Sequence, residues 1–227
     1  MIEKYYYGGA IRAIGSSNIS ISDSIFSLNK GSSGGVLSVR DSSAVSIKFS
    51  IFTSNLASEG GVIHVSQDET ILIENCTFSN NSASKTGGTV SATSITNFTI
   101  ASSAFKSNRA TQGGVVYATN YVHMYMQNII LSNNAANLGM MYFIESTCIV
   151  SGFSEFMTNI GSIFAYNSNI MIAGNATFIN SYPSSINRTT YSEGGVITAF
   201  QSKIILSGLC NLKHNFAESG GASCIRN

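Results

Sequence analysis

Apolar and polar residues alternate along this chain in short runs that recur in the same order. One pair of mostly apolar residues stands two and four positions after a glycine, and a second pair stands ten and twelve positions after it. A period of two residues indicates β-strands whose alternate side chains face a core, and it excludes helices. The first set is Leu37/Val39, Ile63/Val65, Val90/Ala92, Val116/Ala118, Met141/Phe143, Ile163/Ala165 and Ile197/Ala199, and the second is Ile19/Ile21, Val45/Ile47, Ile71/Ile73, Phe98/Ile100 and Met124/Met126.

The glycines that open these runs mark an internal repeat, and we count positions within each coil from them. A closing Phe or Leu follows each glycine after 17 residues in eight coils, whereas the distance to the next glycine varies between 5 and 17. A fixed length suits stacked strands, because one extra residue would reverse the faces, and a variable length suits a surface loop. The glycines are Gly9, Gly35, Gly61, Gly88, Gly114, Gly139, Gly161, Gly195 and Gly221, and the closing residues are Phe26, Phe52, Phe78, Phe105, Leu131, Phe156, Phe178 and Leu212.

This repeat predicts an all-β parallel β-helix of about eight to nine coils, each of roughly 26 residues with three strands. We expect residues 1–227 to form a single repeat domain. Neither end carries a polar cap of the kind that solenoids need, so we expect an excerpt of a longer array or partners that supply the caps.

An asparagine follows the closing residue by three positions in all coils but one, where Ser181 replaces it. In register, these amides would lie about 4.8 Å apart and could form a hydrogen-bonded ladder. The alternative is that Asn merely tolerates a left-handed turn. The paired glycines indicate a sharp corner or a close backbone approach. The ladder candidates are Asn29, Asn55, Asn81, Asn108, Asn134, Asn159 and Asn215.

The composition argues against several classes of function but does not identify one. The net charge of +1 and 10% charged residues argue against nucleic acid or an anionic membrane as a partner. The sequence has no transmembrane run and no signal peptide at its start. Four cysteines, at 76, 148, 210 and 224, match neither a disulfide framework nor a zinc site, and no cofactor is expected.

Coils 5 to 8 are the expected contact face, because their outward positions are unusually apolar. Such a patch usually marks contact with a partner, although a flanking segment of the same chain could cover it and an aromatic row could also stack on sugars. The outward residues expected on the first strand are Tyr117, Tyr142, Ile144, Phe164, Tyr166 and Phe200, and those on the second are Cys148, Val150, Ile170, Ile172, Ile204 and Leu206.

The longest loop, residues 179–193, follows a coil whose own loop is nearly deleted, and the pair would form a step on the wall. Tyr182, Asn187, Arg188 and Tyr191 would line that step, which makes it a candidate binding site. An inert insertion is the alternative reading.

Catalysis is not expected. Polysaccharide-cleaving β-helices need clustered acids or a calcium site, whereas the eleven acids here are scattered and His64, His123 and His214 lie in different coils. His64 is expected to be solvated on an outward position. The rival hypothesis is a carbohydrate-active β-helix whose catalytic coils are absent or unrecognised.

The pairing of Gly-Gly-Ala-Ile (residues 8–11) and its relatives with Phe-x-x-Asn resembles the repeat of the chlamydial polymorphic outer membrane proteins, along the whole chain. Val usually replaces Ala at the third position, and no autotransporter barrel is expected within these 227 residues. The resemblance implies a pectin-lyase-like, right-handed β-helix that is displayed at a cell surface for adhesion, and the crossover rule also favours that hand. We therefore expect an extracellular adhesin or stalk that binds protein or carbohydrate, with flanking repeats of the same chain as neighbours.

Overall fold

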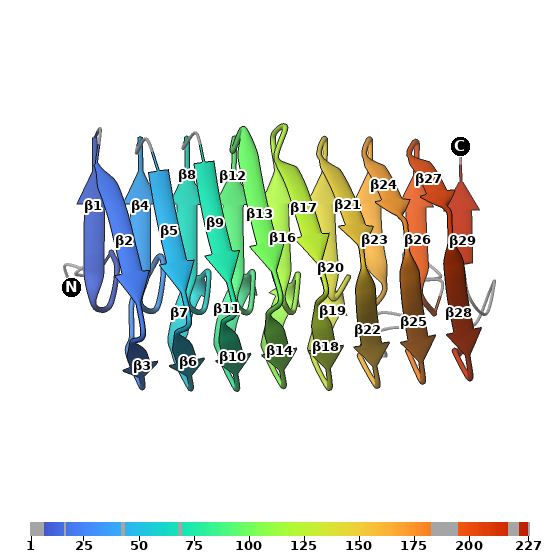
Figure 1. Cartoon of the computed structure of the whole chain (residues 1–227), viewed down its shortest axis with the longest axis horizontal. Helices are drawn as coiled ribbons and strands as arrows, with labels where there is room; N and C mark the ends of the chain where they lie inside the picture. The colour runs from blue at the N-terminus through green and yellow to red at the C-terminus, as the bar shows by residue number, and fades with distance from the viewer. Residues whose placement is uncertain are drawn as a thin grey trace.

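The computed structural model describes residues 7–15, 17–41, 44–67, 70–182 and 195–217, together with the backbone of strand β29. Every regular element in these residues is a β-strand, and the strands stack into four parallel sheets along one long axis (Figure 1). The predicted all-β parallel β-helix is therefore confirmed.

Sheets 1 and 2 hold the first two strands of each coil. Sheet 1 contains, in order, β1 (Ile11–Ile14), β4 (Leu37–Arg40), β8 (Ile63–Ser66), β12 (Val90–Thr93), β16 (Val116–Thr119), β20 (Met141–Ile144), β23 (Ile163–Tyr166), β26 (Ile197–Phe200) and β29 (Ser223–Arg226). Sheet 2 contains β2 (Asn18–Ser22), β5 (Ala44–Lys48), β9 (Thr70–Glu74), β13 (Asn97–Ala101), β17 (His123–Gln127), β21 (Thr147–Ser151), β24 (Asn169–Ile172) and β27 (Lys203–Leu206).

Sheets 3 and 4 complete the cross-section. Sheet 3 carries the closing residues on β3 (Ile25–Ser27), β6 (Ile51–Thr53), β10 (Thr77–Ser79), β14 (Ala104–Lys106), β18 (Ile130–Ser132), β22 (Phe153–Met157), β25 (Asn175–Ile179) and β28 (Leu209–Lys213). Sheet 4 consists of β7 (Leu56–Glu59), β11 (Ser82–Thr86), β15 (Arg109–Gln112) and β19 (Ala135–Leu138).

Sheet 4 corrects the expectation of three strands per coil. It is formed by the loops that follow four of the asparagines, which have nearly equal lengths and therefore lie beside one another. The neighbouring coil shields the backbone N–H and C=O groups of these loops from water. Pairing between the loops gives these groups hydrogen-bond partners. Outside these strands the pairing shrinks to single bridges, such as the bridge between Ile160 and Tyr182.

The core is a set of columns in which equivalent residues lie directly above one another. Phe78 pairs in register with Phe52 on one side and Phe105 on the other, and the ring centroids are 4.9 Å apart in both pairs. The rings are within 7° of parallel, because the strands hold them at one strand spacing. Phe52, Phe78 and Phe105 are fully buried, so this column excludes water.

The second strand in coils 6 to 8 corrects the predicted inward face. Cys148 and Val150 were expected outside but are fully buried, and Cys148 pairs with the inward Met124. The turn before this strand has three residues in coil 5 (120–122) and two in coil 6 (145–146), so the strand shifts by one residue and its alternation reverses. The third strand then begins two positions earlier in the coil than in coil 5, which keeps the count of 17.

The same one-residue shift turns the other four residues of the predicted outward set toward the core. Ile170 and Ile172 are buried, and Ile204 packs against the core. Leu206 pairs with Ile172 in the same inward register but is 46% exposed.

The asparagines form a hydrogen-bonded ladder at the corner after sheet 3. Nδ2 of Asn81 donates to Oδ1 of Asn108 at 3.0 Å and to the carbonyl of Phe52 at 3.0 Å. Oδ1 of Asn108 also accepts from the backbone N–H of Asn81, so each buried amide has its donors and acceptor occupied. The side-chain bonds run without a break through Asn29, Asn55, Asn81, Asn108, Asn134 and Asn159. Beyond the break at Ser181, Asn215 accepts from the Ser181 backbone N–H.

The paired glycines serve two different needs at the corner before sheet 1. The first glycine takes a positive φ, as at Gly87 (63°). The second, such as Gly88, approaches the next coil so closely that an added Cβ would lie 2.1 Å from the carbonyl oxygen of Gly114. The corner therefore requires both conformational freedom and the absence of a side chain.

Replacement of Asn108 by Ala is expected to destabilise the chain by about 2–4 kcal/mol, because it leaves several buried polar groups on both neighbouring coils without partners. Urea unfolding followed by circular dichroism measures the change. Asn137→Ala is the matched control, since Asn137 is exposed on β19 and outside the ladder. Equal losses in the two variants would contradict a stabilising ladder.

Candidate binding surfaces

The outer face of sheet 1 consists of two parallel rows that change character along the solenoid. Apart from Ile14, both rows are polar or cationic in coils 1 to 4. Aromatic residues enter the first row in coils 5 to 7 and the second row in coils 7 and 8. The row three positions after the glycine is Arg12, Ser38, His64, Ser91, Tyr117, Tyr142, Phe164 and Thr198, and the row five positions after it is Ile14, Arg40, Ser66, Thr93, Thr119, Ile144, Tyr166 and Phe200.

The aromatic part of the first row is a stacked column. Tyr117 and Tyr142 have ring centroids 5.3 Å apart and 9° between their planes, and Tyr142 and Phe164 are 4.6 Å and 2° apart. Phe200 contacts Phe164 at 5.6 Å with a tilt of 43°. The inner rings therefore cover one another's faces, which are the surfaces that a stacked sugar would need.

This column is also less exposed than the sequence suggested. Tyr142 and Phe164 are only 8% and 5% exposed, whereas an outward face was expected to be wet. The backbone before the strand lies close to these side chains, because a Cβ added at Gly139 would be 2.6 Å from Cβ of Phe164 and 3.2 Å from Cδ2 of Tyr142. Tyr166 is the exposed predicted member at 42%, and the assignment of the set to binding stays a prediction.

The predicted step beside the longest loop is described only at its start. Tyr182 is 39% exposed and stacks on Phe216, with centroids 5.4 Å apart and 2° between the rings. Asn187, Arg188 and Tyr191 lie outside the described residues.

Sequence reasoning missed an apolar surface on sheets 2 and 3, which we call the apolar wall. It consists of the register-matched row Tyr125, Ile149, Met171 and Ile205 on sheet 2, together with Phe153 and Leu209 just past the corner on sheet 3. The exposed Asn175 lies between Phe153 and Leu209 in the sheet 3 register. Tyr125 is 48% exposed, Phe153 74% and Leu209 68%. Gly152, Gly174 and Gly208 could have indicated the altered corner from the sequence, because these glycines occur only in the three shifted coils. All three have a positive φ at the corner between sheets 2 and 3.

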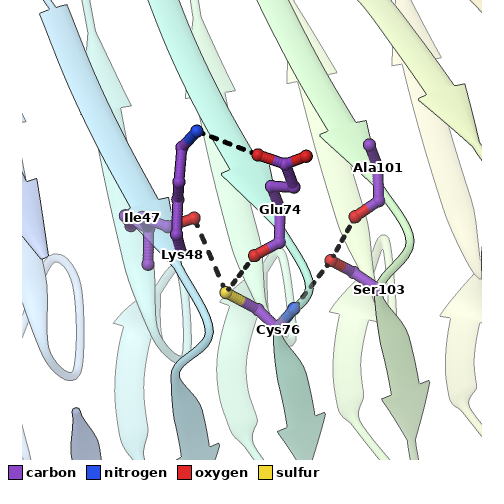
Figure 2. Close-up of polar contacts among 6 residues, drawn as sticks. All are labelled: Ile47, Lys48, Glu74, Cys76, Ala101 and Ser103. Carbon is purple, nitrogen blue, oxygen red and sulfur yellow. Dashed lines mark hydrogen bonds and ion pairs between the residues drawn. The ribbon is translucent and has the colours of Figure 1, made fainter. Parts of the chain in front are cut away.

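The corner between sheets 2 and 3 carries a second polar stack, drawn in Figure 2. The Cys76 thiol donates to the carbonyl of Glu74 at 3.3 Å, and its backbone N–H donates to Oγ of Ser103 at 3.1 Å. Nearby, Lys48 Nζ lies 2.9 Å from a Glu74 carboxylate oxygen, on the solvent side of the corner. Ser50 makes the equivalent hydroxyl contact one coil earlier, so Cys76 replaces a serine.

Burial raises the pKa of the Cys76 thiol, and it raises that of the fully buried Cys148 much further. A thiol must ionise to act as a nucleophile. Both side chains are therefore suited to packing and hydrogen bonding rather than to covalent chemistry.

A polar pocket lies on the outer face of coils 1 to 3. Arg12 and Arg40 enter it from neighbouring strands of sheet 1, and His64 follows one coil later. Glu59 of β7 lines the opposite side, and the Arg12 guanidinium carbon lies 4.5 Å from the centre of the Tyr7 ring.

His64 is half-buried in this pocket, whereas the sequence suggested a solvated side chain. Burial lowers its pKa, the Glu59 carboxylate opposes that shift, and Arg40 adds to it. The Nδ1 atom of His64 is buried without a hydrogen-bond partner among the described residues. Burial also raises the pKa of Tyr117, with a smaller contribution from Glu59.

Within the described residues, no group of three or more His, Cys, Asp and Glu side chains could hold a metal ion. The described part of the chain also has no helix with the length and apolar character needed to cross a membrane.

Tyr142→Ala is expected to cost about 3–5 kcal/mol of stability, because it opens a hole in a buried ring stack. Tyr166→Ala, which removes an exposed ring from the neighbouring row, is expected to cost less than about 1 kcal/mol. Urea midpoints at constant m-value compare the two. A small and equal effect at both positions would show that the column does not contribute to folding.

The stability of the protein is expected to fall as pH drops from 7.5 to 5.5, partly through His64. The unfolded chain takes up a proton at this residue near pH 6.5, whereas the folded chain resists it because its pKa is lowered. The unfolded state then binds more protons, which disfavours folding. His64→Gln should reduce the slope of unfolding free energy against pH, and His123→Gln, a substitution of an exposed histidine, is the matched control. An unchanged slope in His64→Gln would refute this assignment.

Comparison with known families connects these features to a described repeat. Residues 75–93 match the Chlamydia polymorphic membrane protein repeat, which confirms the resemblance seen in the sequence. Searches of curated proteins and of solved structures found no match. The matched segment runs from the corner before β10 through the Asn81 corner and the glycine pair into β12, and the neighbouring coils repeat this arrangement. The chain is thus a parallel β-helix that carries the Chlamydia polymorphic membrane protein repeat at residues 75–93.

Proposed function

We propose that this chain is a non-catalytic segment of a surface-displayed protein, and that it holds a contact wall at a fixed distance from the cell. The repeat match supports the proposal most directly, because the matched family is one of membrane proteins. A continuous, register-matched core supports the role of a stiff spacer, since each coil is bonded to both neighbours.

The distribution of acids supports a non-catalytic role. Glu59 lies on sheet 4, Glu74 on sheet 2 and Glu155 on sheet 3. Glycoside cleavage on a β-helix needs two carboxylates that face one bound sugar from either side. These three, the acids that lie on strands within the described residues, are on three different faces and do not provide that pair.

The apolar wall is the proposed contact surface, and its partner is an apolar face of another protein at a cell surface. The sheet 2 row contains no charged residue from Tyr125 to Ile205, and the adjoining Phe153 and Leu209 are the most exposed apolar side chains among the described residues of coils 6 to 8. A carbohydrate ligand would need several polar partners for its hydroxyls, whereas the only polar side-chain group of this row is the phenol of Tyr125. Apolar and aromatic side chains at this density are typical of the centre of protein interfaces.

Replacement of both Tyr125 and Phe153 by Ser is expected to reduce binding of the purified chain to cultured host cells at least tenfold, because it removes the two most exposed rings of the wall. Flow cytometry with labelled protein measures the binding. Ile25→Ser is the matched control, since Ile25 is 72% exposed but lies in coil 1. Circular dichroism verifies that the variants are folded.

Two outcomes would overturn the proposal. Binding that is unchanged in the double variant would exclude the wall as the contact surface. Loss of self-association in analytical ultracentrifugation, without loss of cell binding, would make the wall an interface between copies. Surface display is tested separately with antibodies against the chain on intact cells, where absence of labelling before permeabilisation would refute it.

A further inference from the structure

We propose that the polar pocket of coils 1 to 3 binds a sugar that carries a single carboxylate. The pocket is separated along the solenoid from the apolar wall of coils 5 to 8, and the inference does not depend on the proposed function. It rests on the placement of two arginines and one histidine around one small residue.

Ser38 forms the floor of this arrangement. Arg12 precedes it and His64 follows it in the same row, each one strand away, while Arg40 lies two residues further along the same strand. With strands about 4.8 Å apart, and alternate residues on one strand roughly 7 Å apart, an anionic group above Ser38 is within reach of all three side chains. The small, buried Ser38 leaves the space that a larger residue would fill.

The charges around this floor are only partly balanced, because two arginines and one glutamate line the pocket. Among the described residues, neither Arg12 nor Arg40 forms an ion pair; the pairs are Lys48–Glu74 and Lys85–Glu59. Glu59, the acid of the pocket, lies 3.9 Å from Lys85 Nζ, so its charge is shared with a cation outside the pocket. Both arginines are exposed, and a guanidinium presents paired donors that fit a carboxylate.

Two polar atoms at the site have unused hydrogen-bonding capacity. Nδ1 of His64 and Oγ of Ser66 are buried, and each lacks a partner in the part of the chain that the structure describes. Ser66 pairs in register with Arg40, so both atoms lie on the side of the pocket beside β8. Buried polar groups of folded proteins are usually satisfied, which makes these two atoms notable in a pocket wall.

The mixture of groups selects the chemical class of the ligand. Two arginines require a negative charge, whereas Glu59 repels a second one and can accept a hydrogen bond from a hydroxyl. The rest of the lining consists of serine hydroxyls, the Tyr7 ring and the apolar Ala13, Ile14 and Val39, a mixture that suits the hydroxyls and the apolar face of a sugar ring. A sugar with one carboxylate and free hydroxyls meets these conditions, while a densely charged phosphate or sulfate polymer does not.

Isothermal titration of the full chain with D-glucuronate, N-acetylneuraminate and D-glucose tests the proposal. At least one acidic sugar should bind, and glucose should bind at least tenfold more weakly. The two acidic probes distinguish a chain uronate from a terminal acidic sugar. The double variant Arg12→Gln/Arg40→Gln should weaken binding at least tenfold, whereas Arg109→Gln, an exposed arginine on sheet 4, should leave it unchanged.

Three results would overturn the proposal. Absence of binding by both acidic sugars, or equal affinity for glucose, would exclude a carboxylate-directed site. Inorganic sulfate that binds as tightly as the acidic sugar would indicate a simple anion site. Should the double variant fail to fold, Ser38→Phe fills the floor without removing charge and should also abolish binding; retained binding in a folded Ser38→Phe chain would place the ligand elsewhere.

Discussion

In-register pairing of parallel strands is the constraint on which this molecule depends. Each backbone hydrogen bond between coils sets the next strand at one spacing, so a residue repeated at one position of the coil becomes a column. The Phe78 column, the asparagine ladder and the Tyr142 stack are all products of that pairing. The second glycine of the corner has the same origin, because Gly88 meets the carbonyl of Gly114 where the coils approach most closely.

The strands, the asparagine corner and the ladder could be predicted from the sequence, because residues that form a column recur at regular intervals along the chain. The count of 17 and the two-residue alternation identified the strands, and Phe-x-x-Asn identified the corner and its ladder. The ladder could be predicted from the sequence because the Asn108 side chain bonds to the amides of the coils on either side of it, so asparagine recurs at the same position of each coil. The sequence could not show the fourth strand, because β7 and its equivalents have no strict alternation and pair only since their loops have similar lengths.

The missed reversal in coils 6 to 8 has a specific physical cause. One residue is lost from the first turn and the third strand begins earlier, so the total of 17 is the same in both arrangements. A count from the glycine therefore cannot reveal that Cys148 and Val150 have moved inward. The burial of side chains on the outer face of sheet 1 could not be predicted from the sequence either. Tyr142 is sheltered because the backbone before the strand lies close to it, and His64 is half-buried, which no local pattern records.

The reversal also explains why the apolar surface lies where it does. In coil 6 the second strand offers two sets of side chains, Cys148 with Val150 and Thr147 with Ile149 and Ser151, and the turn length decides which set faces the core. Both sets contain an apolar residue, so hydrophobicity alone does not settle the choice. The core receives the small Cys148 beside the long Met124, and the branched Ile149 is left beside Tyr125 on the outside. Because every later coil must match its neighbour's register, that choice is propagated to Met171 and Ile205, and a difference of one residue in one turn becomes a continuous row on the wall.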